Sequence, residues 1–166
     1  LPKHRPPMNL QLNCKAVTDE ILALSALRCA TSAKSHRLIT RDQLPGLRII
    51  MRMVFAELMV ELTGLVDTCN IDTEDPDPTL PYDDTTPLTL EVGLKNSDSF
   101  SPGMALTVKR QLEHMVAAGT LGWAATESDA DFSRSLQNRR EAALSALRNT
   151  LEENATEIAC RPSCDW

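Results

Sequence analysis

The chain has 166 residues, a length that suits one domain with a core of its own. Its 42% of hydrophobic and 24% of charged residues are ordinary for a globular protein, but only 4% of the residues are aromatic. So few rings favour a core of aliphatic side chains packed between helices. They also argue against single-stranded nucleic-acid binding by base stacking.

The net charge of −6 is unevenly distributed along the chain. Residues 1–66 hold nine Lys and Arg against five Asp and Glu, a balance of +4, whereas residues 67–166 hold eight against eighteen, a balance of −10. This polarity allows copies to assemble head to tail, with the basic end of one on the acidic end of the next. The simpler interpretation is that the acidic part only favours solubility.

The five cysteines match no small disulfide framework, because their number is odd and their spacing is irregular. We therefore expect a reducing compartment rather than a secretory one. Cys160 and Cys164 have three residues between them, whereas zinc and redox motifs usually place two. Free thiols are favoured there, while a disulfide within the tail and a metal or redox role stay open.

The first residues predict an extended arm, because residues 1–7 contain three prolines and three basic side chains. They form no signal-peptide pattern, since no apolar stretch follows them. Met8 would also serve as a start, so whether residues 1–7 are native is left open. Residues 8–14 then alternate strictly between apolar and polar side chains, which predicts a half-buried strand.

The first helix is expected to begin at Thr18, where a capping hydroxyl is followed by two acids that suit the positive end of the helix dipole. Its apolar stripe fades by Ser35, and Pro45-Gly46 breaks the polar segment that follows. The next stretch, residues 47–65, is the most apolar of the chain and predicts one long helix.

This second helix has apolar residues on nearly all sides, interrupted only by Arg48, Arg52, Glu57 and Glu61. A helix of this kind is normally covered on most faces. The four charges argue against a membrane span, because each costs about 2.5–3.5 kcal/mol near the bilayer centre. We therefore expect a central core helix, covered by the strands and the last two helices, whose charged stripes reach solvent or a neighbouring subunit.

Residues 67–87 change character, with four prolines, seven acids and no basic residue. They predict a long acidic surface loop, of a length that compact domains usually reserve for function or disorder. The spacing of a calcium-binding loop is absent. Docking on a basic partner or simple solvation is therefore favoured over a metal site.

The remaining elements are a second strand and two helices. Residues 88–94 alternate again and predict a short strand that pairs with the first or docks on an edge. One helix is expected over 101–123 behind a Ser-Pro start, and another over 131–151 behind a capping pattern at 128–131.

The predicted fold is therefore mainly α: a small bundle of about four helices with two short β-strands and a long acidic loop. A single domain is expected over residues 8–155. It is flanked by the basic, Pro-rich arm at 1–7 and by an irregular, Cys-containing tail at 156–166.

No motif predicts a catalytic, cofactor-binding or metal-binding residue. His4, His36 and His114 stand alone, and neither of the glycine-rich phosphate-binding motifs occurs. Six basic residues between Arg28 and Arg52 could meet phosphates, but the acidic remainder would repel DNA. We therefore expect a protein that is not an enzyme and has no cofactor.

The order of parts in the second half resembles a known class of proteins. An alternating strand at Leu88–Leu94 is followed by a helix that begins with Ser101-Pro102 and runs into Gly122-Trp123-Ala124-Ala125. A last helix then contains Ala143-Leu144-Ser145-Ala146-Leu147-Arg148. Over about residues 86–152 this pattern is similar to small structural proteins in the head–tail module of tailed bacteriophages, particularly phages of gut Bacteroides. The resemblance implies a small, mostly helical, non-enzymatic protein assembled as a ring beneath the portal.

The leading expectation is a virion protein, a head–tail connector or neck component whose homo-oligomeric ring joins the portal and the tail or other neck proteins. DNA would be only the content of its channel, and no membrane is involved. The alternative is a small cytoplasmic helical adaptor or regulator that binds a protein partner. The residues expected to contact partners lie in the arm and the acidic loop: Lys3, His4, Arg5, Asp72, Glu74, Asp75, Asp77, Asp83 and Asp84.

Overall fold

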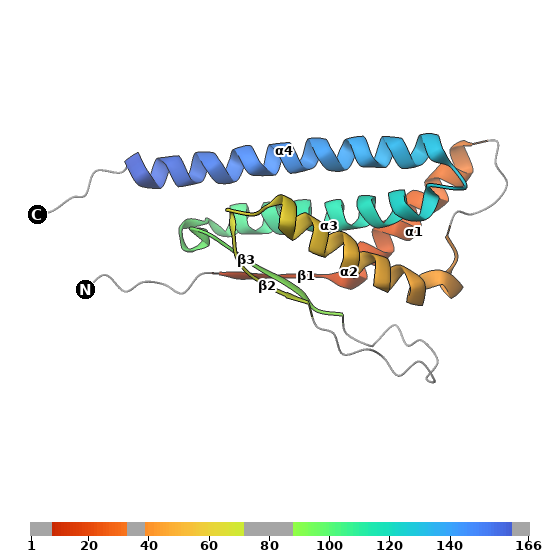
Figure 1. Cartoon of the computed structure of the whole chain (residues 1–166), viewed down its shortest axis with the longest axis horizontal. Helices are drawn as coiled ribbons and strands as arrows, with labels where there is room; N and C mark the ends of the chain where they lie inside the picture. The colour runs from red at the N-terminus through yellow and green to blue at the C-terminus, as the bar shows by residue number, and fades with distance from the viewer. Residues whose placement is uncertain (1–7, 33–38, 72–87, 161–166) are drawn as a thin grey trace, which may run out of the picture.

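The computed structural model describes residues 8–32, 39–71 and 88–160, which form four helices and a three-stranded sheet (Figure 1). The prediction of a mainly α fold with four helices is confirmed over these residues. Short 3-10 turns, η1 (Arg41–Gln43) and η2 (Ser97–Ser99), precede the second and third helices. In chain order the main elements are β1 (Asn9–Leu12), α1 (Cys14–Thr31), α2 (Leu44–Glu61), β2 (Val66–Ile71), β3 (Leu90–Leu94), α3 (Pro102–Ala125) and α4 (Ala130–Cys160).

The centre of the fold is α3, which packs against α1, α2, α4 and β1. We expected the helix over 47–65 to be central, and this expectation is wrong. Small residues explain why α3 takes the place: they let neighbouring backbones approach closely, so helices pack on several of its sides. The run includes Ala117, Ala118, Gly119 and Gly122, of which all but Gly119 are buried.

The second helix, α2, buries only one face. Its buried residues include Leu47, Met51, Phe55 and Leu58, which follow helical spacing and point to α3 and the sheet. Its opposite face is apolar but exposed, since Ile49, Met53 and Val60 are not covered by any described element. The helix over 47–65 therefore packs on one side of the core, with an apolar face that the described residues leave uncovered.

The sheet has the strand order β1-β3-β2, with both pairs antiparallel. Of the two arrangements expected for the predicted strands, pairing is the one found, with Leu10 opposite Val92 and Leu12 opposite Leu90. All four side chains are buried. They are the apolar positions of the two alternating strands, and they point from the sheet towards the helices.

The third strand, β2, was not predicted, because residues 67–71 were assigned to the acidic loop. Most of its side chains are exposed, so it carries no alternating apolar signal. Its order comes from pairing with the outer edge of β3, where Cys69 lies opposite Val92 and Ile71 opposite Leu90. The rest of the predicted loop, residues 72–87, lies outside the described residues.

Gly93 permits this three-strand pairing. A Cβ atom at that position would collide with Thr68 Oγ1 on β2 and with Asn9 Oδ1 on β1. The central strand therefore has no side chain at this position, and the side chains of Thr68 and Asn9 on the two neighbouring strands occupy the space.

The start of α1 differs from the prediction. Asn13 is the N-cap, since its side-chain oxygen accepts a hydrogen bond from the Ala16 backbone N–H at 3.1 Å. Thr18 lies inside the helix, where its hydroxyl donates to the Cys14 carbonyl at 2.9 Å. The helix begins four residues earlier than Thr18 because Asn is as good a cap as Thr and precedes a helix-compatible stretch.

The starts of the last two helices are closer to expectation. Ser101 caps α3 as predicted, with its hydroxyl accepting from the Met104 N–H at 3.1 Å. At α4 the capping acceptor is Asp129, whose carboxylate accepts from the Phe132 N–H at 3.3 Å.

The predicted irregular tail is wrong over its first residues, because α4 continues to Cys160. No Gly or Pro interrupts residues 130–160, and the first strong breaker is Pro162. Residues 161–166 and the arm at 1–7 lie outside the described residues, as does any pairing of Cys160 with Cys164. Within the described part, Cys14 and Cys69 are free thiols.

Candidate interaction surfaces

The residues predicted to contact partners all fall in segments outside the described parts of the chain. The structure therefore neither brings them together nor separates them. It does show two surfaces that the sequence analysis did not single out. One is a ridge on α2, and the other is a groove between α1 and α4.

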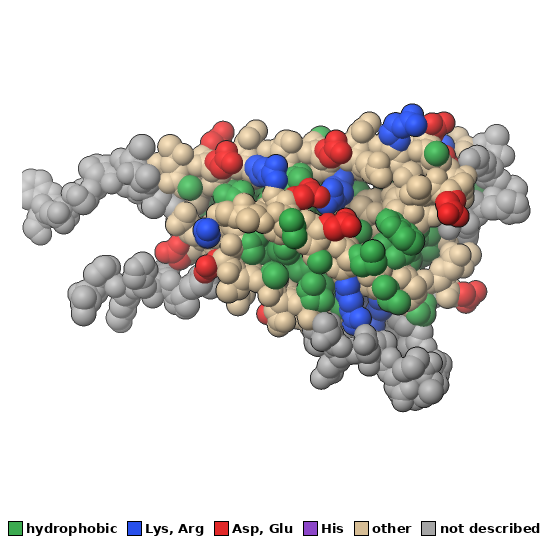
Figure 2. All heavy atoms as spheres, in the orientation of Figure 1, with side chains coloured by type: hydrophobic (Ala, Val, Ile, Leu, Met, Phe, Trp, Pro, Cys, Tyr) green, Lys and Arg blue, Asp and Glu red, His purple; other side chains and the backbone are tan. Residues whose placement is uncertain are grey.

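The first surface is the α2 ridge, formed by Ile49, Met53 and Val60. These side chains are 61%, 48% and 72% exposed, respectively. Their spacing of four and seven residues places them on one face of the helix, with exposed Ala56 between them. Figure 2 shows hydrophobic side chains gathered over α2. Since fully burying one such side chain is worth about 1.5–3 kcal/mol, this face gains considerably from a partner.

Charges of opposite sign flank the α2 ridge. Glu57, which is exposed, lies one turn beyond Met53 on one edge. Arg48 and Arg52, both half-buried, lie on the other edge. The signal for this surface was present in the sequence, since these three charges and Glu61 interrupt an otherwise apolar helix.

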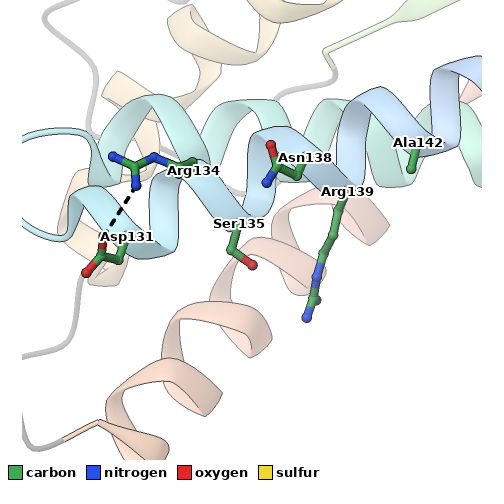
Figure 3. A pocket seen from close by; sticks show the side chains of 6 residues that line it. All are labelled: Asp131, Arg134, Ser135, Asn138, Arg139 and Ala142. Carbon is green, nitrogen blue, oxygen red and sulfur yellow. Dashed lines mark ion pairs between the residues drawn. The ribbon is translucent and has the colours of Figure 1, made fainter.

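The second surface is the α1/α4 groove, which two adjoining hollows form. One, of about 430 Å³, runs along the first half of α4 and includes Arg134 and Asn138 (Figure 3). The other, of about 290 Å³, lies between α1 and α4 and is lined by the apolar side chains of Leu24, Leu27 and Phe132. Three residues line both hollows, which therefore adjoin: Asp131, Ser135 and Arg139.

The rim of the α1/α4 groove is basic and accessible. Arg139 extends from α4 on the side of α1 (Figure 3). Arg134 lies 3.9 Å from Asp131, and both side chains are largely exposed, at 73% and 90%. An ion pair that is so exposed, with its charged atoms 3.9 Å apart, is weak. Arg134 is therefore available to another acidic group.

An ion pair fixes the end of the groove by joining α1 to α4. Arg28 Nε donates to Asp129 Oδ2 at 2.8 Å and Arg28 Nη2 donates to Oδ1 at 3.2 Å, a bidentate arrangement. Asp129 is only 4% exposed, and its hydrogen bond to Arg28 raises the pKa of the guanidinium further. The same guanidinium lies 5.2 Å from the centre of the Phe132 ring, a cation–π contact.

This junction was beyond the reach of sequence reasoning. Arg28 and Asp129 are 101 positions apart, and no local pattern connects them. The hollow between α1 and α4 exists only because the fold brings these two helices together. The groove residues therefore carried no signal of their own in the sequence.

A second polar contact joins α1 to α3. His114 Nδ1 lies in hydrogen-bond contact with Glu20 Oε1. The pKa of His114 is raised, chiefly by this hydrogen bond and further by the charge of Glu20, while partial burial and Arg139 oppose the shift. The imidazole thus favours its charged form and acts as the cation of an interhelical ion pair.

A third set joins α2 to α4. Arg140 Nη2 lies 2.7 Å from Glu61 Oε1, with Arg140 14% exposed. The Arg148 guanidinium donates to the backbone carbonyl of the same Glu61, at the C-terminal end of α2. Both cations sit where the helix dipole is negative, so they stabilise the end of α2 as well as its position.

The buried polar groups near β1 also have structural partners. The Asn13 N–H donates to Glu113 Oε1 at 2.8 Å, and Glu113 is 5% exposed. Burial raises the pKa of the nearby Cys14 thiol to about 11, partly offset by Arg48. Cys14 is therefore protonated at neutral pH and is a poor nucleophile.

Among the described residues, no group of three or more His, Cys, Asp and Glu side chains is arranged to hold a metal ion. None of the described helices is long and apolar enough to span a membrane. Comparison with protein-family models, curated proteins and solved structures finds no match to this chain.

Proposed function

We propose that this chain is a non-enzymatic structural protein that assembles with copies of itself into a ring. More specifically, we propose a head–tail connector or neck component of a tailed bacteriophage, located in the virion between the portal and the tail. Its work is mechanical: subunits hold two larger rings together around a channel through which DNA passes.

The observation that carries the proposal is the position of the two surfaces relative to α3. His114 contacts α1, and Gly119 faces both α2 and α4. Five positions separate the two residues, which places α1 about 140° from α2 around α3 at 3.6 residues per turn. The α2 ridge belongs to α2 alone and the α1/α4 groove to two other helices, so each copy presents two different surfaces, as a repeating assembly requires.

The sequence pattern supports the finer proposal. The stretch that resembles phage head–tail proteins, about residues 86–152, contains β3, the central helix α3 and the ordered core of α4. The uneven charge, +4 over residues 1–66 and −10 over 67–166, also suits contact between unlike parts of neighbouring copies.

The test is the state of assembly of the full chain. Native mass spectrometry and negative-stain microscopy across a range of concentrations are expected to show a closed ring. Mixing with a portal protein from the same genome is expected to attach that ring to the portal. A chain that remains a monomer or simple dimer under both conditions contradicts the proposal and favours an adaptor that binds an unrelated protein.

A further inference from the structure

We infer that neighbouring copies associate head to tail, with the α2 ridge of one copy seated in the α1/α4 groove of the next. This inference rests on the proposed function and assigns the contact through which the ring would form. The occupant of the groove is thus a second copy of this chain, which enters with its helix α2.

The apolar side chains of the two surfaces match in kind. The α2 ridge presents three aliphatic side chains along one helix face, and the groove offers Leu24, Leu27 and Phe132 between two helices. Leu27 is 60% exposed, a high value for a leucine that already lies beside a hollow. A helix laid with its apolar face into such a groove is a common mode of recognition.

The charges match as well. Seating the ridge brings exposed Glu57, at its edge, towards the basic rim, where Arg139 and Arg134 project from α4. The only described acid lining the groove is Asp131, which is 90% exposed and turned to Arg134. Glu57 of the entering helix therefore meets Arg134 and Arg139, and this charge complementarity sets the orientation of the helix in the groove.

The two surfaces are different, so the contact they make is heterologous and can be repeated by every copy. When two copies associate, the pair still has one unoccupied ridge and one unoccupied groove, so further copies can add in the same way. Such a contact closes into a ring when the rotation between neighbours divides a full turn, and otherwise continues as a filament.

The experiment uses one variant for each surface. Met53→Lys places a charge in the ridge, and Leu27→Lys places one beside the groove floor. Both positions are exposed, so each variant is expected to fold, with circular dichroism and a thermal melt as the check. The matched control is Leu106→Lys on α3, which is 55% exposed and belongs to neither surface.

Each ridge or groove variant is expected to be monomeric at concentrations at which the wild-type chain and Leu106→Lys assemble. An equimolar mixture is expected to form a dimer and nothing larger, because the intact ridge of Leu27→Lys fits the intact groove of Met53→Lys. The inference is overturned if the mixture stays monomeric, or if either variant assembles like the wild-type chain.

A charge exchange tests the orientation. Glu57→Arg and Arg139→Glu are each expected to weaken association about tenfold, and the double variant to regain most of it. Failure of the inference and of the proposed function give different results. Rings that persist in both lysine variants contradict only the ridge-and-groove contact, whereas wild-type filaments built through that contact support it and contradict the ring.

Discussion

Gly119 is the residue at which three helices meet. A Cβ atom at this position would lie 2.6 Å from Val54 Cγ1 on α2 and 3.4 Å from Arg140 Cδ on α4. Val54 is β-branched and stiff in a helix, so it cannot turn aside easily. The absence of a side chain at Gly119 thus sets how closely α2 approaches α3.

We expect Gly119→Ala to lower the free energy of unfolding by about 1–3 kcal/mol, the usual cost of overpacking a core. Urea unfolding monitored by circular dichroism measures the change. Val54→Ala in the same chain is expected to recover part of the loss, because it removes the colliding methyl group.

Gly122→Ala is the matched control on the same helix. The nearest atom to its added Cβ is Leu136 Cβ at 3.6 Å, an ordinary contact distance. This variant is expected to be neutral or stabilising by up to about 1 kcal/mol, since Ala is the better helix former. A loss at Gly122 equal to that at Gly119 would show that general crowding, and not the contact with Val54, limits α3.

At the scale of elements, three ion-pair systems join helices that lie apart in the sequence. Arg28 with Asp129 ties α1 to α4, His114 with Glu20 ties α1 to α3, and Glu61 with its two arginines ties α2 to α4. Apolar packing supplies most of the stability, while these pairs fix which side of each helix faces its neighbour.

The contact between α2 and α4 predicts a measurable difference between adjacent arginines. Arg140→Ala is expected to destabilise the fold by about 1 kcal/mol, because it removes a 2.7 Å, mostly buried pair with Glu61. Arg139→Ala, one position earlier and exposed, is expected to change stability by less than about 0.5 kcal/mol. Equal effects of the two substitutions, measured by chemical unfolding, would contradict the assigned contact.

The contact between α1 and α3 predicts a dependence on pH. Because the folded state raises the pKa of His114, the charged pair stabilises the fold fully below the ordinary histidine pKa of about 6.5. This contribution is lost as the pH rises through the raised pKa. The pair is about one-third exposed, so the contribution is below about 1 kcal/mol.

The measurement compares wild-type and His114→Gln chains by urea unfolding from about pH 6 to about pH 9. The wild-type advantage is expected to shrink as the pH rises. Glu20→Gln is expected to remove most of the same pH-dependent difference, since it removes the partner. An advantage of wild type that grows with pH would contradict the sign of the shift.

At the scale of the whole molecule, sequence patterns predicted those elements whose burial repeats along the chain. β1, β3 and the four helices were expected within a few residues, apart from the end of α4, because their apolar spacing follows the strand or helix period. β2 was missed because it is ordered by pairing with β3 while its own side chains stay exposed.

What the patterns could not predict was the relative placement of elements. The all-round apolar composition of α2 resembles that of a central helix, yet the small residues of α3 decide which helix is surrounded. The groove depends in the same way on Arg28 reaching Asp129 across 101 positions. Both features arise from contacts between segments distant in sequence, which periodicity within one segment does not encode.

A fold centred on α3 predicts a graded pattern of hydrogen exchange. Amides of the middle of α3, around Leu112–Leu121, are expected to exchange only by global unfolding, because helices or strands pack on most of its sides. The last turns of α4 are expected to exchange much faster, since Leu151 is its last buried residue among those described. Mass spectrometry of the exchanging chain measures both. Protection of residues 152–156 as strong as that of α3 would mean that another copy or segment covers this part of α4, because none of these five side chains is buried in the described structure.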